Sequence, residues 1–405
     1  MKKSTNKHTS IILVLSFLLS ILKICTAIGT INTTQFLRDG DTLVSSGGVF
    51  ELGFFSPGNS KNRYVGIWYK KIPGNTVVWV ANKEIPLTST LGILKVIEPG
   101  VLALLNDTNN ILWSSNTSTV ARNPILQLLD SGNLVLREAT DDNPENFLWQ
   151  SFDYLSDTTL PSTKFGWNYV TGRENYLSSW KTNEDPSPGN FTFHLDPTGY
   201  PQGIIKSGNL TLCRIGPCLS GIPNARQDPT YRYGLFMSKN KKYYWEEAID
   251  KSVISRVTLS QSGVVQRRTW VDRIQDWIVY LNIPADICDS YKICGAYGRC
   301  NIGNSPACGC LNKFVPKDPE GWVRSDWSNG CIRRTPLNCQ KGDVFLKYSG
   351  IKLPDSRYSS WINESMTLEE CEVAYVFKEL LLYGIHTIRY QQKGEWMLIL
   401  VWRLG

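Results

Sequence analysis

Three short apolar runs that each contain a tryptophan recur along the chain: TVVWV at 76–80, NILWS at 110–114 and NFLWQ at 146–150. Trp113 follows Trp79 by 34 residues, and Trp149 follows Trp113 by 36. A period of this size marks a fold built from copies of one small unit. The runs are rich in β-branched and aromatic residues and are bounded by turn residues, so the unit is predicted to consist of strands.

Three such units are expected to close on one another. A single short sheet cannot bury its apolar face alone, so three units that each donate a tryptophan can close around a pseudo-threefold axis. The indole rings would then fill the centre, because their large apolar surfaces gain most from burial. The sequence therefore predicts a mainly β fold with an internal threefold repeat between about residues 50 and 150.

Longer motifs around the tryptophans point to a family. They are ELGFFSPG at 51–58, YVGIWY at 64–69, VWVAN at 78–82 and LLDSGNLVL at 128–136. These motifs resemble the bulb-type lectin domain, in the version found in plant S-locus glycoproteins and S-domain receptor kinases. The resemblance continues to about residue 373, and it is specific because many long motifs occur in the family's order.

The resemblance implies a mainly β chain with several domains. It implies a bulb-lectin β-prism with a pseudo-threefold repeat at 28–157 and a β-rich S-locus glycoprotein domain at 158–283. A disulfide-rich EGF-like module would follow at 284–331, and a partial PAN/apple domain at 339–373. The alternating run at 190–195 independently predicts a half-exposed strand in the second domain.

Residues 1–27 are predicted to be a secretory signal peptide. Lysines precede the apolar run at 11–22, and Cys25-Thr26-Ala27 offers a small-residue cleavage site; the alternative is a signal anchor. Cleavage would remove four lysines and lower the formal net charge from +7 to +3. Because this charge is mild and the basic residues are scattered, a nucleic-acid partner is not expected. We expect a secreted, extracellular protein, whereas family members otherwise lie in the plasma membrane.

Six glycosylation sequons of the type Asn-x-Ser/Thr agree with secretion. They lie at Asn32, Asn106, Asn116, Asn190, Asn209 and Asn363. Attached carbohydrate is bulky and polar, so these asparagines are expected on the surface and outside interfaces.

Cleavage would also leave ten cysteines, which are disulfide candidates in a secreted protein. Six of them fall within 44 residues and predict a disulfide framework, for which spacing alone leaves fifteen connectivities open. Their spacing resembles an EGF-like module, which implies the pairs Cys288–Cys300, Cys294–Cys308 and Cys310–Cys331. No histidine is near and zinc sites favour CxxC pairs, so no metal is expected. An acidic cluster is also missing before Cys288, so we expect neither calcium nor another cofactor.

The segment CRIGPC at 213–218 departs from the family, which has tryptophans where this chain has Cys213 and Cys218. Two interpretations stay open. The cysteines form a local disulfide, or the chain has lost two structural tryptophans under relaxed selection. The loss of a large core aromatic typically costs about 3–5 kcal/mol.

The resemblance also implies candidate sugar-binding positions. Mannose-binding bulb lectins carry a QxDxNxVxY pattern, and its degenerate match here is Gln127, Asp130, Asn133 and Val135, with Arg137 in place of the tyrosine. A site based on hydroxyl recognition loses much affinity when one polar partner is missing. We therefore favour the alternative that Asp130 and Asn133 only shape a turn.

No catalytic constellation is visible. After signal removal the histidines are His194, expected on the surface of a strand, and His386. Carboxylate pairs such as Glu246-Glu247 are expected on a solvated face. The sequence contains no catalytic triad, phosphate loop or kinase signature set. We therefore predict no catalytic residues and do not expect the chain to be an enzyme.

After about residue 374 the resemblance stops, and the segment 374–405 is interpreted as an out-of-frame tail. Read one base later, its codons can encode the cysteine-rich PAN run of the family. Downstream of the signal there is no apolar run of about 18 residues, so the chain is expected to lack a membrane span. The kinase domain of the receptor kinases is likewise not expected in it.

The first functional hypothesis is a non-catalytic extracellular recognition module. The family is linked to pollen recognition and defence signalling, which implies a protein or peptide ligand or a receptor-kinase relative as partner. The alternatives are a mannose-type carbohydrate-binding lectin and a truncated duplicate without function.

Overall fold

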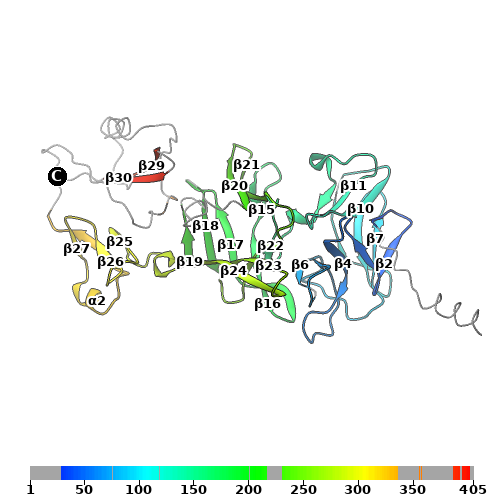
Figure 1. Ribbon diagram of the computed structural model, residues 1–405, viewed down its shortest axis with the longest axis horizontal. Helices are drawn as coiled ribbons and strands as arrows, with labels where there is room; N and C mark the ends of the chain where they lie inside the picture. The colour runs from blue at the N-terminus through cyan, green and yellow to red at the C-terminus, as the bar shows by residue number, and fades with distance from the viewer. Residues whose placement is uncertain are drawn as a thin grey trace, which may run out of the picture.

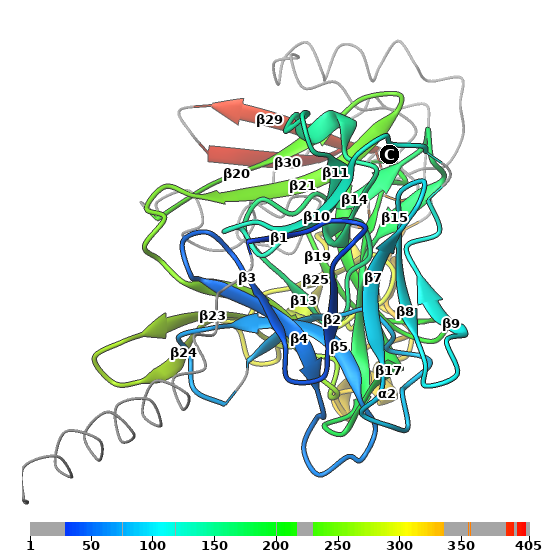
Figure 2. The same ribbon diagram turned by 90° about the vertical axis from the view of Figure 1, so that its right-hand side faces the viewer.

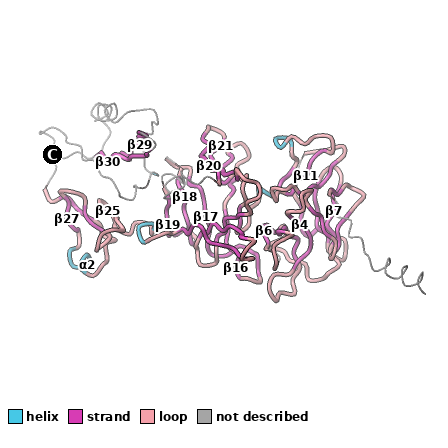
Figure 3. Tube along the Cα trace, viewed as in Figure 1, coloured by secondary structure: helices cyan, strands magenta, loops and turns pink. Residues whose placement is uncertain are grey.

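The computed structural model describes residues 29–74, 76–117, 119–199, 201–216, 230–335, 355 and 357, and the backbone of 386–392 and 395–401. Figure 1 shows an elongated molecule in which a body of strands β1–β12, a body of strands β13–β24 and a small module with β25–β28 follow one another. Strands and loops dominate the part of the chain that the structure describes, and its helices are few and short (Figure 3). Among the described residues, no helix is long and apolar enough to span a bilayer.

Several predictions fall on other parts of the chain. The predicted signal peptide, Cys218, and the partial PAN/apple segment apart from Asp355 and Arg357 lie outside the described residues. In the predicted tail, β29 (His386–Gln392) and β30 (Glu395–Val401) pair as an antiparallel hairpin.

The first body contains three four-stranded antiparallel sheets, and we call it the first prism. The first sheet comprises β3 (Thr42–Val44), β4 (Phe50–Phe55), β5 (Tyr64–Tyr69) and β6 (Val77–Val80), in that order. The second comprises β2 (Phe36–Arg38), β7 (Ile93–Ile97), β8 (Val101–Leu105) and β9 (Ile111–Ser114). The third comprises β1 (Thr30–Ile31), β10 (Pro124–Leu128), β11 (Leu134–Glu138) and β12 (Trp149–Gln150). Figure 2 looks at this body end-on, with the sheets on three sides.

The centre of the first prism is a triangle of tryptophans, as the repeat predicts. The ring centroids of Trp79, Trp113 and Trp149 lie 5.8–6.3 Å apart, and all three pairs meet edge to face. Each indole comes from the last strand of its sheet, opposite an aliphatic residue of the neighbouring strand: Ile67, Leu104 and Leu136. Edge-to-face contact is a favoured arrangement of aromatic rings, so equivalent positions of three sheets make one core.

The second body also contains three four-stranded antiparallel sheets, and we call it the second prism. Its first sheet comprises β16 (Leu177–Thr182), β17 (Asp185–Asp196), β18 (Gln202–Ser207) and β19 (Leu210–Ile215). Its second has the order β15 (Arg173–Asn175), β14 (Phe165–Asn168), β21 (Lys241–Ala248) and β20 (Tyr231–Met237). Its third comprises β13 (Thr158–Thr159), β22 (Ser255–Leu259), β23 (Val265–Val271) and β24 (Asp276–Ile283).

The two prisms share a chain path. In each, the first strand joins the last sheet, since β1 pairs with β10 and β13 pairs with β22. The next strand joins the middle sheet, since β2 pairs with β7 and β14 pairs with β21. In the first prism the following four strands, β3–β6, form the remaining sheet; in the second, β15 first pairs with β14, and β16–β19 then form the remaining sheet. The sequence predicts a β-rich second domain but not this repetition of the first.

The second prism has a core of mixed residue types, and one expectation is corrected there. Its apolar residues come from all three sheets and include Phe193, Cys213 and Val265. Glu246 is not solvated: it is 7% exposed and ion-paired with Arg267. His194 lies on the opposite face of β17 from the buried Phe193 and Leu195 and is partly exposed; its ring stacks on Tyr176, and its Nδ1 lies 2.9 Å from a Glu174 oxygen.

The small module is held by three disulfides with the pairing that the resemblance implies: Cys288–Cys300, Cys294–Cys308 and Cys310–Cys331. Its elements are η5 (Ile287–Asp289), β25 (Gly298–Cys300), β26 (Cys308–Cys310), β27 (Phe314–Pro316), α2 (Pro319–Val323) and β28 (Cys331–Arg333). Asp318 caps α2 by accepting a hydrogen bond from the Gly321 amide at 2.9 Å. The remaining short helices, η1 (Pro144–Asn146) and η2 (Ser151–Asp153), lie at the end of the first prism.

Candidate functional site

Asp130, a predicted sugar-binding residue, is hydrogen-bonded within the first prism. One carboxylate oxygen accepts from the Gly47 amide at 2.7 Å and the other from the Ser46 hydroxyl at 2.8 Å. Burial raises the pKa of Asp130, but hydrogen bonds from Ser45, Gly47 and Ser46 outweigh this effect, so the pKa lies below its ordinary value. The carboxylate thus fixes the turn between β3 and β4.

Asn133 is also engaged internally, although sugar recognition would require its amide. The side chain is 6% exposed. Its nitrogen donates to the Gln150 side-chain oxygen at 2.9 Å, and its oxygen accepts from the Ser151 hydroxyl and the Phe152 amide, each at 3.2 Å. Asn133 therefore anchors the segment that follows β12.

Gln127 and Val135 form the centre of the same outer sheet face. They are direct cross-strand neighbours, and Val135 is fully buried. The Gln127 oxygen accepts from Arg137 Nε at 2.9 Å, while Arg137 Nη1 donates to backbone carbonyls of Glu138, Ala139 and Asp141. The structure brings the four predicted residues to one region, but their hydrogen-bonding atoms are used within the chain.

The predicted glycosylation positions have different exposures. Asn32, Asn116, Asn190 and Asn209 are exposed, whereas Asn106 is partly buried and its side-chain oxygen accepts from the Thr108 amide, the Thr108 hydroxyl and the Asn110 amide. Asn363 lies outside the described residues.

One group of three cysteine sulfur atoms, in the disulfide module, is spaced closely enough to suggest a metal site. Cys294, Cys300 and Cys308 lie with their Sγ atoms within 4.8 Å of one another. All three take part in disulfides, and a metal ligand must be a thiolate, so this cluster is a structural one.

The prisms meet through aromatic side chains of the first sheet, on its outer face and at Tyr69 in the core of the first prism. Trp180 from β16 packs against a buried cluster on that face: Phe55, Tyr64, Trp68 and Val80. The Tyr69 hydroxyl donates to the Ser255 carbonyl at 3.0 Å, and the Tyr69 and Trp277 ring centroids lie 5.6 Å apart. These contacts join β5 to the third sheet of the second prism.

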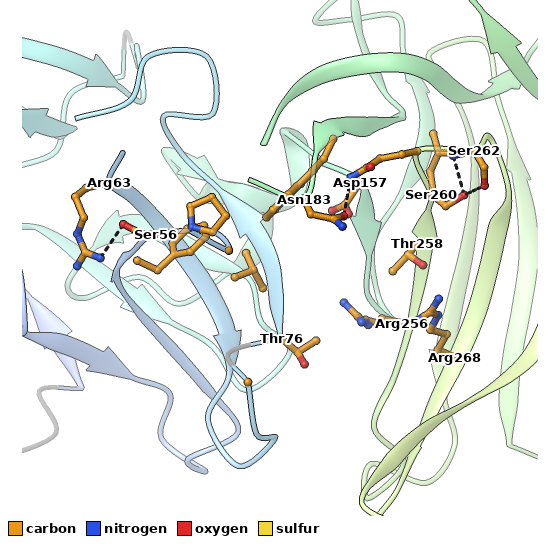
Figure 4. Close-up of a pocket in the computed structure, with 18 of the residues that line it drawn as sticks. Ser56, Arg63, Thr76, Asp157, Asn183, Arg256, Thr258, Ser260, Ser262 and Arg268 are labelled. Atoms are coloured by element: carbon orange, nitrogen blue, oxygen red, sulfur yellow. Dashed lines mark hydrogen bonds between the residues drawn. The ribbon is translucent and has the colours of Figure 1, made fainter. Parts of the chain in front are cut away.

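A cleft of about 1190 Å³ opens beside these contacts. One wall comes from the first prism and includes Ser56 and Thr76, and the other comes from the second prism. Figure 4 shows Arg256, Arg268, Thr258 and Ser260 together on that second wall. We call this space the interprism cleft.

Strand geometry explains the grouping on the second wall. Arg256, Thr258 and Ser260 alternate along and just beyond β22, and alternate residues of a strand share a face. Arg268 on β23 is the direct cross-strand neighbour of Arg256. Two guanidinium groups are therefore presented side by side to the cleft.

Asp157 is the one acidic residue among the described residues that line the cleft. Burial raises the pKa of Asp157 to about 6. The Thr158 hydroxyl, which donates to the carboxylate at 3.0 Å, and the positive charges of Arg256 and Lys83 lower the pKa, but by less. Lys83 donates to the Leu155 carbonyl at 3.0 Å, and burial lowers its pKa. The cleft thus combines three arginines, of which Arg63 is ion-paired with Asp39, with one carboxyl group whose pKa is raised.

Sequence reasoning missed this cleft. The alternation of Arg256, Thr258 and Ser260 is visible in the sequence, but the facing wall lies about 180 residues earlier in the chain. Only the packing of one prism on the other brings the two walls together.

Family comparisons cover most of the chain. The D-mannose binding lectin family matches residues 76–181, and the S-locus glycoprotein domain matches residues 207–318. The S-locus-specific glycoprotein BS29-2 of Brassica oleracea var. alboglabra is 38% identical over 380 residues, covering 92% of this chain and 86% of the relative. The receptor-like serine/threonine-protein kinase SD1-8 of Arabidopsis thaliana is 40% identical over 342 residues, covering 83% of this chain.

The length of the match differs between relatives. The chain spans 40% of the receptor-like kinase but 86% of the S-locus-specific glycoprotein. Among solved structures, a monomeric monocot mannose-binding lectin from Gastrodia elata is 22% identical, with a TM-score of 0.23, over 30% of this chain and 96% of that lectin.

Proposed function

The chain belongs to the family of S-locus glycoproteins and S-domain receptor kinases, and on that premise we propose that it is a non-catalytic extracellular recognition module for a protein or peptide ligand. The matched families are a lectin and an S-locus glycoprotein domain, and neither description names an enzyme. Three disulfides and the sequons support a secreted protein, because such bonds persist in oxidising compartments. Its partner is an extracellular ligand or the ectodomain of a receptor-kinase relative.

We favour a protein or peptide ligand over mannose because the candidate sugar-binding side chains are already hydrogen-bonded within the chain. Asn133 is nearly buried and bonded to Gln150, Ser151 and Phe152, and Asp130 holds the Ser46-Gly47 turn. A sugar hydroxyl would have to replace these bonds rather than meet free groups. The exchange of one hydrogen bond for another yields little net affinity.

Parallel binding screens test the proposal. The purified, glycosylated chain is passed over immobilised mannose and, separately, used to select from a displayed peptide library. We expect no retention on mannose and a convergent peptide motif whose binding is competed by the free chain. Retention that free mannose competes, and that Asn133→Ala abolishes, would instead establish the mannose-type lectin. Selections without convergence would also overturn the proposal.

A further inference from the structure

The two arginines of the interprism cleft form an arrangement that costs stability in the empty protein. Arg256 and Arg268 are direct cross-strand neighbours, and like charges in such positions repel. The Arg256 guanidinium carbon lies 4.6 Å from the centre of the Trp277 ring, which fixes its position without neutralising its charge. Arg268 donates from Nη2 to the Gln266 side-chain oxygen at 2.6 Å, a neutral acceptor.

Both guanidinium groups retain unused hydrogen-bonding capacity. The Nε atoms of Arg256 and Arg268 are buried and have no hydrogen-bond partner, and neither side chain forms a salt bridge with a described residue. Buried polar groups normally have partners, and an exception requires an explanation. These Nε atoms lie out of reach of a ligand, but the terminal Nη atoms of Arg256 make no hydrogen bond to a described residue, so a bound carboxylate can accept from that end of the guanidinium group.

The other charges of the cleft leave this positive character in place. Asp157 contributes one negative charge at most, against the two arginines. Arg63 also lines the cleft, but it is ion-paired with Asp39. The charged groups at the cleft therefore sum to a net positive site, which favours an anion.

The uncharged lining favours a carbohydrate over a peptide. Hydroxyl and amide side chains occur on both walls. Ser56, Asn183, Ser260, Gln261 and Ser262 are hydrogen-bonded to other residues of the chain, whereas the hydroxyls of Thr76 and Thr258 have no partner among the described residues and match the hydroxyl groups of a sugar. The apolar lining residues Phe54, Phe55, Pro57 and Leu259 are buried, and the partly exposed Val77 and Trp180 pack against the aromatic cluster between the prisms. They are held by contacts within the chain rather than forming the open apolar pocket that anchors a peptide. A volume of about 1190 Å³ accommodates several sugar units.

We propose that the interprism cleft binds an acidic oligosaccharide, with the guanidinium groups of Arg256 and Arg268 holding the carboxylates of its uronic-acid units. The site is separate from the mannose-type positions on the third sheet of the first prism. It also goes beyond the proposed protein or peptide ligand, and either function can fail without the other.

Calorimetric titration of the whole chain with trigalacturonic acid tests the proposal. We expect binding that weakens with added salt, because it depends on charge. Arg268→Gln should weaken it about tenfold or more, since one charge-assisted contact is lost. Arg256→Lys keeps the charge but loses the planar fork, so it should weaken binding by a smaller factor.

Matched controls separate binding from folding. Arg324→Gln removes an exposed arginine at the C-cap of α2 in the disulfide module and should leave binding unchanged. Thermal unfolding of each variant establishes that it is folded, and if Arg256→Lys does not fold, Arg268→Gln alone decides. The methyl ester of the trisaccharide should bind at least about tenfold more weakly than the acid, because it lacks the carboxylate charge.

Specific results would overturn the proposal. Unmeasurable binding of trigalacturonic acid, equal binding of its methyl ester, or unchanged binding by Arg268→Gln would each refute it. Tighter binding of tetraglutamate than of trigalacturonic acid through the same arginines would assign the cleft to an acidic peptide instead. A peptide motif from the display selection whose binding ignores Arg268→Gln would concern the proposed function alone.

Discussion

The two prisms follow the same chain path but have different centres. Trp79, Trp113 and Trp149 form the centre of the first prism, where apolar rings contact apolar rings. The second prism has a mixed apolar core, and beside it lies the buried ion pair of Glu246 and Arg267. One topology therefore tolerates two kinds of interior.

The ion pair of the second prism is surrounded by tyrosines. The Arg267 guanidinium carbon lies 4.7 Å from the centre of the Tyr231 ring, and the Tyr244 hydroxyl donates to Glu246 at 3.3 Å. Burial raises the pKa of Tyr244, so it stays protonated as a donor. Burial opposes the charge of Arg267, but Glu246 and the tyrosines keep its pKa above the ordinary value. The comparison teaches that closure requires a filled centre, not a particular residue type.

Removal of one tryptophan is the most severe test of the first prism. Trp79 is 5% exposed and donates from its indole to the Tyr154 carbonyl at 2.8 Å. We expect Trp79→Ala to lower the free energy of unfolding by about 5 kcal/mol, because it leaves a large cavity and an unpaired carbonyl. Urea unfolding of the whole chain measures this loss.

Hydrogen exchange locates the damage caused by Trp79→Ala. We expect protection to fall in β4, β8 and β11 of the first prism and to persist in β17 and β18 of the second. Tyr280→Ala, at a side chain that is 60% exposed, is the control and should change stability by less than about 0.5 kcal/mol. Equal loss of protection in both prisms would show that they share one cooperative core.

A charge-pair experiment tests the interior of the second prism. Glu246→Gln leaves Arg267 charged and without its carboxylate, so we expect it to cost about 3–4 kcal/mol. Replacement of both partners by Met and Leu removes both charges and should restore most of that stability, since apolar residues of similar volume can replace a buried pair. The free energies of unfolding of the single and double variants are compared in a double-mutant cycle. A double variant as unstable as the single one would mean that the pair is required for closure.

The sequence predicts the first prism better than the second for a physical reason. Three tryptophans at equivalent positions make the first repeat visible. The core of the second prism uses different residues at its positions, such as Phe193, Cys213 and Val265, so no residue type recurs along the chain. Glu246 looks solvated beside Glu247, and only its cross-sheet partner reveals that it is buried.

The candidate sites show the same limit of prediction from sequence alone. Resemblance finds Asp130 and Asn133, but their roles depend on Gly47 and Gln150, which approach only in the folded chain. The interprism cleft exists only where two separately folded prisms meet. Local patterns therefore predict strands and repeats, whereas side-chain roles and interdomain sites depend on tertiary contacts.

The smallest of the three expected effects on the free energy of unfolding concerns Asp157, at the boundary between the prisms, and it depends on pH. The pKa of Asp157 is raised from 3.8 to about 6, chiefly by burial, so the folded chain prefers the protonated acid more than the unfolded chain does. Stability from this preference is complete below about pH 4 and is lost as the pH rises through about 6. At pH 7 the charged carboxylate should cost about 3 kcal/mol relative to a neutral side chain, since one pKa unit corresponds to about 1.4 kcal/mol.

Asp157→Asn should remove this pH dependence and raise stability at pH 7, because the amide oxygen can still accept from Thr158 without carrying a charge. The measurement is the free energy of unfolding of both proteins between pH 4 and pH 7, with Asp142→Asn, at an exposed acid, as the control. Parallel curves for wild type and Asp157→Asn would contradict the prediction. Other charged groups in or beside the cleft are Arg256, Arg268, Lys83, the Arg63–Asp39 pair and Glu184, which lies against the lining residue Gly58. Since Asp157→Asn removes the one acid of the described lining, it should also tighten trigalacturonic acid binding at pH 7, which joins the stability of the boundary to the chemistry of the cleft.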